Sequence, residues 1–149
     1  MDVVSPIAQV VGAIALLAPS PAPGPWTATL DHLDLVRSAA FARRDPSMLE
    51  GVYVAGTGLA EEDAAVMADW RRRGLALGPV RVRVLRASEV SRTDRRVVLD
   101  VVDRLEPVGA RDGDGRWHRL PRDGATDRRV VLRLTDGGWR VESSVRVAG

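Results

Sequence analysis

Only a few side chains of this sequence have the chemistry of a general acid, a general base or an oxyanion donor. Tyr53 is the one tyrosine, and His32 and His118 are the two histidines. Asp103 shares the parity of the alternating apolar residues 97–101, which directs its side chain toward the same face of a strand. We expect Tyr53, Asp103 and His118 to supply the polar groups of any pocket.

These residues do not form a catalytic signature, and we assign none of them a catalytic role. His32 lies beside Asp31 on a helical flank, and His118 lies near a loop, so solvation explains both. The two histidines are widely spaced and the chain has no cysteine, so the sequence contains no recognisable metal-ligand set. It also lacks the motifs of a phosphate-binding loop and a nucleophile elbow. The sequence favours a non-enzymatic protein without a metal or cofactor.

Three of the four tryptophans begin or end an expected element: Trp26, Trp70 and Trp139. The first interpretation is packing in the core and at its rim. The alternative is an aromatic lining for a ligand pocket, or an exposed ring that anchors a partner. Together with the three polar residues above, these tryptophans complete the candidate pocket.

All 22 basic side chains are arginines, a bias typical of GC-rich coding DNA such as that of actinobacteria. The formal net charge is only +2, which disfavours nucleic-acid binding. Arginines at alternating strand positions form a candidate basic surface for anionic lipid headgroups or an acidic partner: Arg81, Arg83, Arg133, Arg140 and Arg146. The simpler alternative is a solvated sheet face.

The first half of the chain is predicted to be mainly helical. Apolar residues recur at helical spacing over residues 26–44, and Asp45 can cap a short helix that follows. A brief strand over residues 51–54 precedes a third helix over residues 60–73. That helix has acidic residues in its first turn and three arginines in its last, so both groups complement the helix dipole.

The second half is predicted to be an antiparallel sheet, because the apolar period changes to two. The expected strands lie near residues 80–84, 97–102, 116–120, 130–134 and 139–147. In the last strand, alternation places these residues on one face: Trp139, Val141, Ser143, Val145 and Val147. Helices followed by strands predict an α+β fold in which N-terminal helices pack on one face of the sheet.

Residues 1–18 form a hydrophobic segment that is too short for a typical membrane span of about 20 residues. Three interpretations stay open: a signal peptide or short anchor, a truncated transmembrane helix, or a helix packed on the domain or a partner. Residues 19–25 are a Pro-rich extended linker, and residues 26–149 form one domain. We expect a membrane-associated or exported protein, with its domain outside the cytoplasmic membrane and membrane contact through residues 3–18. A cytoplasmic location is the alternative.

The segments AFARRDPSMLEGVYVAG, WRRRG and TDGGWRV resemble the nuclear transport factor 2-like, or cystatin-like, superfamily. The resemblance covers about residues 26–147 and implies a cone, in which a strongly curved sheet wraps a long helix around an apolar pocket. Members include SnoaL-like cyclases, ketosteroid isomerases and protein-binding domains. The hydrophobic segment and the linker are most similar to those of an actinobacterial group tethered outside the membrane. No aspartate matches the catalytic base of the ketosteroid isomerases.

Two functions follow as expectations. The first is a non-enzymatic, tethered or exported domain that binds another envelope protein, or a second copy of itself, as the resemblance implies. The alternative is a small-molecule-binding protein, or a SnoaL-like or ketosteroid-isomerase-like enzyme, that uses the cone. A cone filled with apolar side chains favours the first, and an open cavity with converging polar groups favours the second.

Overall fold

The computed structural model describes residues 24–119 and 124–148. Its elements in chain order are α1 (Pro25–Arg43), the 3₁₀ helix η1 (Pro46–Gly51), α2 (Leu59–Arg72), β1 (Ala76–Leu77), β2 (Val82–Arg92), β3 (Arg96–Leu105), β4 (Gly109–Arg111), β5 (Trp117–Arg119), β6 (Thr126–Thr135) and β7 (Gly138–Arg146). Residues 1–18 and most of the linker lie outside this part of the chain. Within it, no helix is both long and apolar enough to cross a membrane.

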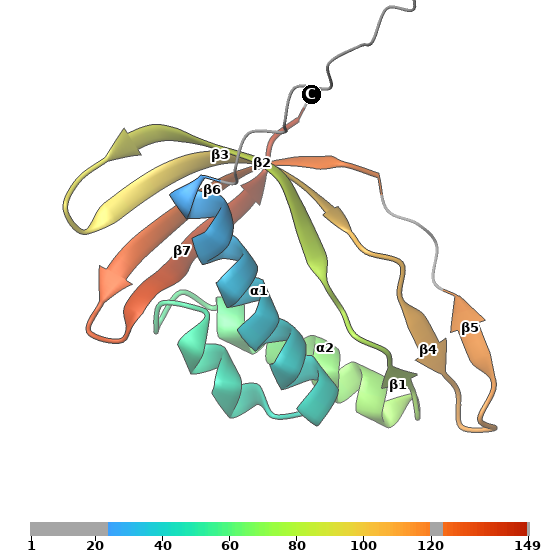
Figure 1. Cartoon of the computed structure of the whole chain (residues 1–149). Helices are drawn as coiled ribbons and strands as arrows, with labels where there is room; N and C mark the ends of the chain where they lie inside the picture. Colours follow the sequence, from blue (N-terminus) through green and yellow to red (C-terminus); the bar gives the residue numbers. More distant parts are fainter. Residues whose placement is uncertain (1–23, 120–123, 149) are drawn as a thin grey trace, which may run out of the picture.

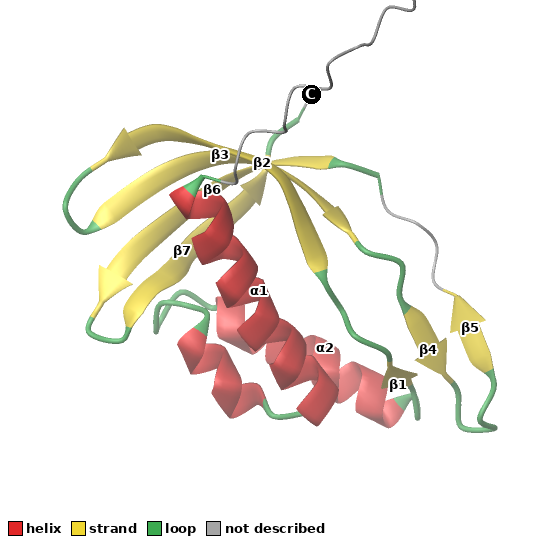
Figure 2. Cartoon of the chain, viewed as in Figure 1, coloured by secondary structure: helices red, strands yellow, loops and turns green. Residues whose placement is uncertain are grey.

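The predicted α+β fold is confirmed. Four long strands form an antiparallel sheet in the order β2-β3-β6-β7, and this sheet curves around α1 (Figure 1). A small second sheet has the order β1-β4-β5 and lies to one side of the long sheet (Figure 2). The two remaining helices, η1 and α2, lie at the lower end of α1 in this view. Within residues 24–119 and 124–148, the helices therefore cover one face of the long sheet, and no helix covers the other face.

The hydrophobic core lies between α1 and the concave face of the long sheet. Its buried side chains are Leu30, Leu33, Val52, Val97, Leu99, Val101, Val130, Leu132 and Val141. On the helix these residues are three positions apart, and on the strands they are two positions apart, so each element presents one apolar face. The burial of these two faces against each other is the main stabilising term, at roughly 25 cal/mol per Å² of apolar surface.

Local signals set the ends of the helices. Pro25 occupies the first position of α1, where its missing N–H costs nothing. The helix ends at Arg44, whose φ of 55° is left-handed. Asp45 then caps η1, because its Oδ1 accepts a hydrogen bond from Ser47 N at 3.0 Å. The chain therefore reverses direction between α1 and η1 at the position that the sequence indicates.

A β-bulge changes the faces expected for the last strand. The register pairs Leu132 with Val141 and Val130 with Ser144, so three residue steps on β7 match two on β6. The extra residue reverses the alternation. Ser144 therefore joins the inner face, and Val145 points outward, where it is 60% exposed. The prediction that Val145 shares a face with Val141 is wrong for this reason.

Candidate functional site

A cavity of about 250 Å³, called the cone cavity below, lies between α1 and the concave face of the long sheet. Core residues such as Leu30 on α1 and Val101 on β3 form its apolar walls. Its polar lining consists of Asp34, Arg37, Tyr53, Asp103, Arg128 and Ser144. The cone is thus partly open, and polar groups reach it from both the helix and the sheet.

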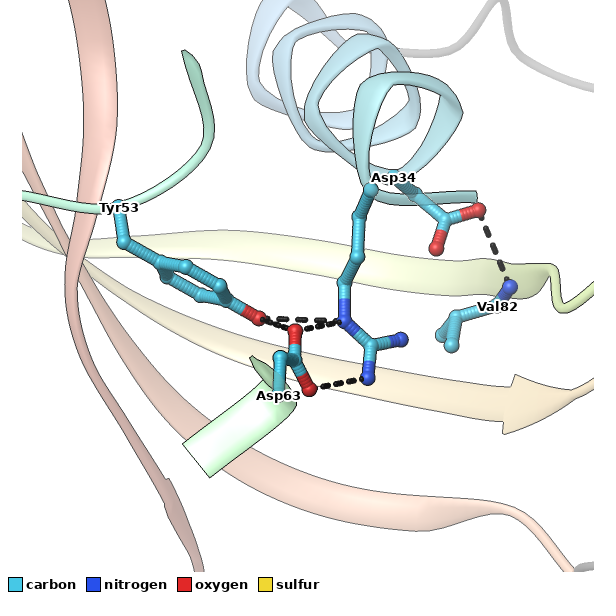
Figure 3. Close-up of polar contacts among 5 residues, drawn as sticks. Asp34, Tyr53, Asp63 and Val82 are labelled. Carbon is cyan, nitrogen blue, oxygen red and sulfur yellow. Dashed lines mark hydrogen bonds and ion pairs between the residues drawn. The ribbon is translucent and has the colours of Figure 1, made fainter. Parts of the chain in front are cut away.

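Arg37, Tyr53 and Asp63 form a hydrogen-bonded cluster beside the cone cavity (Figure 3). Arg37 Nε and Nη2 donate to the two carboxylate oxygens of Asp63 at 2.7 and 2.8 Å. The Tyr53 hydroxyl donates to Asp63 Oδ2 at 2.7 Å and accepts from Arg37 Nε at 3.1 Å. Asp63 is the one buried residue of α2. The cluster therefore fastens α2 to α1 and to the segment after η1.

The environment of this cluster raises the pKa values of Tyr53 and Arg37, so both groups stay protonated. Burial raises the pKa of the Tyr53 hydroxyl well above its usual range, and the positive charge of Arg37 only partly opposes this rise. Burial is the largest single influence on Arg37 and lowers its pKa, but the hydrogen bonds and charge interactions with Asp63 and Tyr53 together outweigh burial, and the pKa lies above its ordinary value. Tyr53 therefore stays neutral and Arg37 stays charged at physiological pH.

Asp34 joins α1 to the start of β2. Its Oδ2 accepts hydrogen bonds from Arg81 Nε at 2.8 Å and from Val82 N at 3.1 Å, the second of which is drawn in Figure 3. Burial raises the pKa of Asp34, and the hydrogen bonds from Arg81 and Val82 oppose that rise. Asp34 therefore orients the start of β2 and forms an ion pair with Arg81 at the cavity wall.

Asp103 on β3 and Arg128 on β6 form an ion pair between neighbouring strands. Arg128 Nε lies 3.3 Å from Asp103 Oδ1 and 3.2 Å from Oδ2. Both side chains line the cone cavity and also a second cavity of about 270 Å³, which includes Trp70. Arg37 and Val82 are shared by the two cavities as well. The two cavities are therefore neighbours, and the Asp103–Arg128 pair and Arg37 lie between them.

The structure brings only some of the sequence candidates together. Tyr53 and Asp103 line the cone cavity, and Trp70 lines the second cavity. Trp26 and Trp139 instead pack against the core, edge to face, with ring centroids 5.1 Å apart. Their role is structural: they attach the beginning of α1 to the sheet.

His118 lies on β5 in the small sheet and not in the cone. Its side chain is 56% exposed, and its Nε2 lies 2.6 Å from Asp112 Oδ2. This contact lowers the pKa of Asp112. The same carboxylate accepts hydrogen bonds from Asp114 N and Arg116 N, so it organises the hairpin turn between β4 and β5. His118 therefore supports a turn.

Three of the five arginines of the candidate basic surface are held by contacts within the protein. Arg81 pairs with Asp34 at the cavity wall. Arg140 donates to main-chain carbonyl oxygens of its own hairpin. Arg133 pairs with Glu142, which has a second arginine partner. Most of these charges are thus engaged within the protein.

Four residues of the site and its supporting contacts are not among the candidates predicted from the sequence: Asp34, Arg37, Asp63 and Arg128. Asp34 and Arg37 lie one turn apart on α1, and both line the cone cavity. Their spacing of four and seven residues from Leu30 is a helical repeat, and this was the available signal. Arg128 shares the parity of Val130 and Leu132, which places it on their face of the strand. Asp63 carries no comparable signal, because its partner Arg37 is 26 residues away in the chain.

Within residues 24–119 and 124–148, no three metal-ligating side chains gather into a group that could hold an ion. No residue set in this part of the chain therefore suggests a metal centre. What the site offers is a small cavity with an apolar wall and internally neutralised charges.

Comparisons with known proteins identify the fold. No protein-family model and no curated protein matches the sequence. The intermembrane space region of the chloroplast protein ARC6 matches at 15% identity with a TM-score of 0.56, over 85% of this chain and 100% of that one. A nuclear transport factor 2-like protein from Cytophaga hutchinsonii matches at 20% identity with a TM-score of 0.51, over 85% of this chain and 100% of that one.

The chain has the nuclear transport factor 2-like fold. A superfamily member from Salmonella enterica serovar Typhimurium also matches, at 9% identity and a TM-score of 0.50, over 82% of this chain and 89% of that one. At these identities the likeness extends to the fold alone. The nuclear transport factor 2-like fold includes both enzymes and binding proteins, so function has to be argued from the site.

Proposed function

We propose that the chain is a non-enzymatic binding domain, exported or tethered outside the cytoplasmic membrane, that acts through protein–protein contacts in the cell envelope. Its partner is another envelope protein or a second copy of the chain. One observation carries the non-enzymatic part of this proposal: each charged side chain that lines the cone cavity has an ion-pair partner of opposite charge.

Each of the four charged residues in that lining has an ion-pair partner: Asp34 with Arg81, Arg37 with Asp63, and Asp103 with Arg128. A general acid or base must exchange a proton with a substrate, and an ion-pair partner disfavours that exchange because it stabilises the charged form of the group. Tyr53 already donates its hydrogen to Asp63, and its raised pKa opposes ionisation. The arrangement therefore suits structural support better than proton transfer.

The proposed location rests on the sequence before the domain. Residues 1–18 are hydrophobic, and the Pro-rich residues 19–25 would hold the domain away from a membrane. One structural neighbour, the ARC6 region, is itself an intermembrane space region. That neighbour shares only the fold with this chain, so the sequence carries the argument for the location.

Expression of the native gene in its own host, followed by cell fractionation and mass spectrometry of the N-terminus, tests the location. We expect either an intact or upstream-extended N-terminus in the membrane fraction, or a cleaved protein outside the cell. An intact protein confined to the cytosol would contradict the proposal. In that case residues 7–18 would be a packing helix.

The open cone cavity favours a second candidate function, the binding of a small molecule. Each cavity, at about 250 and 270 Å³, lies just below the ~300–1,000 Å³ typical of ligand pockets, but the two adjoin. A thermal-shift screen of a compound library tests it, with Asp103→Ala as the variant. Compounds that stabilise the wild type and not the variant would support ligand binding. Equal shifts for both proteins would contradict it.

A further inference from the structure

Five arginines lie at the end of the molecule where α1 and α2 both end: Arg43, Arg44, Arg71, Arg72 and Arg73, called the basic end below. In Figure 1 the two helices end on the same lower side of the molecule. All five side chains are exposed. Arg72 and Arg73 share one exposed partner, Asp69. The other three make no ion pair or hydrogen bond with a described side chain.

The helix dipoles do not account for this much charge. Two carboxylates, Asp45 and Asp69, lie in the same stretches of chain, which leaves an excess of three positive charges. Each helix C-terminus carries about half a negative charge, so the two helices together compensate about one of the three. An excess of about two positive charges remains. The formal net charge of the whole chain is +2, so this end concentrates it.

The second cavity lies at the same end of the two helices, and its lining combines apolar side chains with the charged Arg37, Asp103 and Arg128. The second cavity of about 270 Å³ is lined by Phe41 from the last turns of α1 and by Trp70 from the last turn of α2. Val66, one turn before Trp70, also lines it and is 42% exposed, so the cavity has an open side on α2. Arg73 follows Trp70 by three residues, which places it on the same side of α2.

The size and the charge of this region together indicate what it can hold. A volume of about 270 Å³ is below the ~300–1,000 Å³ of most ligand pockets. It is suited to one bulky apolar side chain of a partner, and such anchors in desolvated pockets dominate many protein interfaces. The arginines of the basic end, which follow Phe41 and Trp70 in the chain, favour acidic residues next to that anchor and disfavour basic ones.

We propose that the basic end and the second cavity together dock an acidic segment of a partner protein, which inserts one bulky apolar side chain between Phe41 and Trp70. This inference rests on the proposed protein–protein function and names its partner class. A membrane surface fits less well. The tether would join α1 at Pro25, and the 19 residues of α1 hold the basic end about 28 Å from that point.

Fluorescence anisotropy with labelled synthetic peptides tests the proposal. The probes are short peptides rich in Asp and Glu with a central Trp, Phe or Leu. The controls carry Ser at the centre, or Lys in place of the acidic residues. We expect saturable binding of the anchored acidic peptides and roughly tenfold weaker binding of both controls. The proposal is overturned if no anchored acidic peptide binds more tightly than its Ser or Lys counterpart.

Paired charge variants locate the binding surface. Arg43→Ala/Arg71→Ala removes two exposed charges from the basic end, and we expect roughly tenfold weaker peptide binding. Arg86→Ala/Arg95→Ala removes the same charge from exposed positions of β2 and the turn after it, and should leave binding unchanged. Equal losses in both double variants would show a non-specific charge effect and overturn the proposal.

A second pair of variants tests the cavity. Val66→Asp places a carboxylate at the open side of the second cavity, and Val90→Asp makes the same change on β2. The two valines are 42% and 50% exposed, so both variants should fold, which circular dichroism would verify. We expect Val66→Asp to abolish peptide binding and Val90→Asp to preserve it. Unchanged binding of the Val66 variant would contradict insertion into the cavity.

Photo-crosslinking of the full chain in its host separates this inference from the proposed function. A photoreactive residue would replace Val66 beside the second cavity, or Val145 on the open sheet face. Crosslinks from position 66 to another protein agree with both the docking inference and the proposed protein–protein function. Crosslinks to another protein only from position 145 would refute docking at the basic end but agree with a protein–protein function. The absence of crosslinks to another protein from either position would count against the docking inference and against the proposed function. Binding to phosphatidylglycerol vesicles without peptide binding would assign the surface to lipid instead.

Discussion

Replacement of Asp63 by asparagine tests the hydrogen-bonded cluster that holds α2 in place. The change removes the carboxylate that pairs with Arg37, whose side chain is only 25% exposed, and the anionic acceptor of Tyr53. Removal of one partner from a buried ion pair costs about 3–5 kcal/mol. Arg37 keeps some solvent contact, and asparagine can still accept one hydrogen bond. We therefore expect a loss of about 2–3 kcal/mol in the free energy of unfolding.

Removal of both charges should cost less than removal of one. The double variant Arg37→Met/Asp63→Leu leaves no unpaired charge in the cluster, so we expect it to be more stable than Asp63→Asn. Asp69→Asn is the matched control on the same helix. Its partners Arg72 and Arg73 are exposed, so the cost should be below about 1 kcal/mol.

Urea denaturation followed by tryptophan fluorescence and by circular dichroism measures all four proteins. The two signals should report one transition, which validates the free energies. The reasoning is refuted if Asp63→Asn costs no more than Asp69→Asn. It is also refuted if the double variant is less stable than Asp63→Asn. Loss of the ion pair itself would then cost more free energy of unfolding than leaving Arg37 unpaired does.

Three further predictions concern stability, each measured by thermal or urea unfolding against wild type. The hydrogen bond from Arg96 holds the pKa of Glu142 below its usual 4.5, so Glu142 stabilises the fold above that pH, and this contribution is lost as the pH falls below it. Glu142→Gln should therefore cost up to about 1 kcal/mol at neutral pH and nothing in acid, and a pH-independent loss would contradict this. Leu49→Ala should cost about 2–5 kcal/mol, because Leu49 is fully buried, and a loss below about 1 kcal/mol would dispute its packing. Trp26→Phe removes the hydrogen bond to Glu89 and should cost about 1 kcal/mol, a loss that Glu89→Gln would not reproduce in full.

Much of the fold can be predicted from the sequence, because the apolar repeats are regular where the long elements lie. The helix expected over residues 60–73 is α2, displaced by one residue at each end. The strand expected over residues 80–84 continues in the structure to Arg92 as β2. Two irregularities in its pairing with β3 interrupt the alternation, so periodicity alone ends this strand too early.

The small sheet could not be predicted in the same way. Its strands β1 and β4 are two and three residues long, too short to show an alternation. They form because Ala76 and Leu77 pair with residues more than 30 positions later in the chain. A pairing of this kind depends on tertiary structure and leaves no local pattern.

The candidate site was predictable only where parity or composition pointed to it. Asp103 follows the parity of its strand, and Tyr53 is the one tyrosine in the sequence. Arg37 and Asp63 each have a satisfactory local explanation as surface charges on a helix. Only the crossing of α1 and α2 brings them to 2.7 Å, and the sequence does not specify that crossing.

The central claim is that this domain acts as a binding domain outside the cytoplasmic membrane. Treatment of intact cells of the native host with an added protease, followed by immunodetection of the domain, tests its location most directly. The account predicts that the domain is digested in intact cells, or is found in the medium, while a cytosolic marker protein survives. Survival of the domain in intact cells, with digestion only after lysis, would contradict the account.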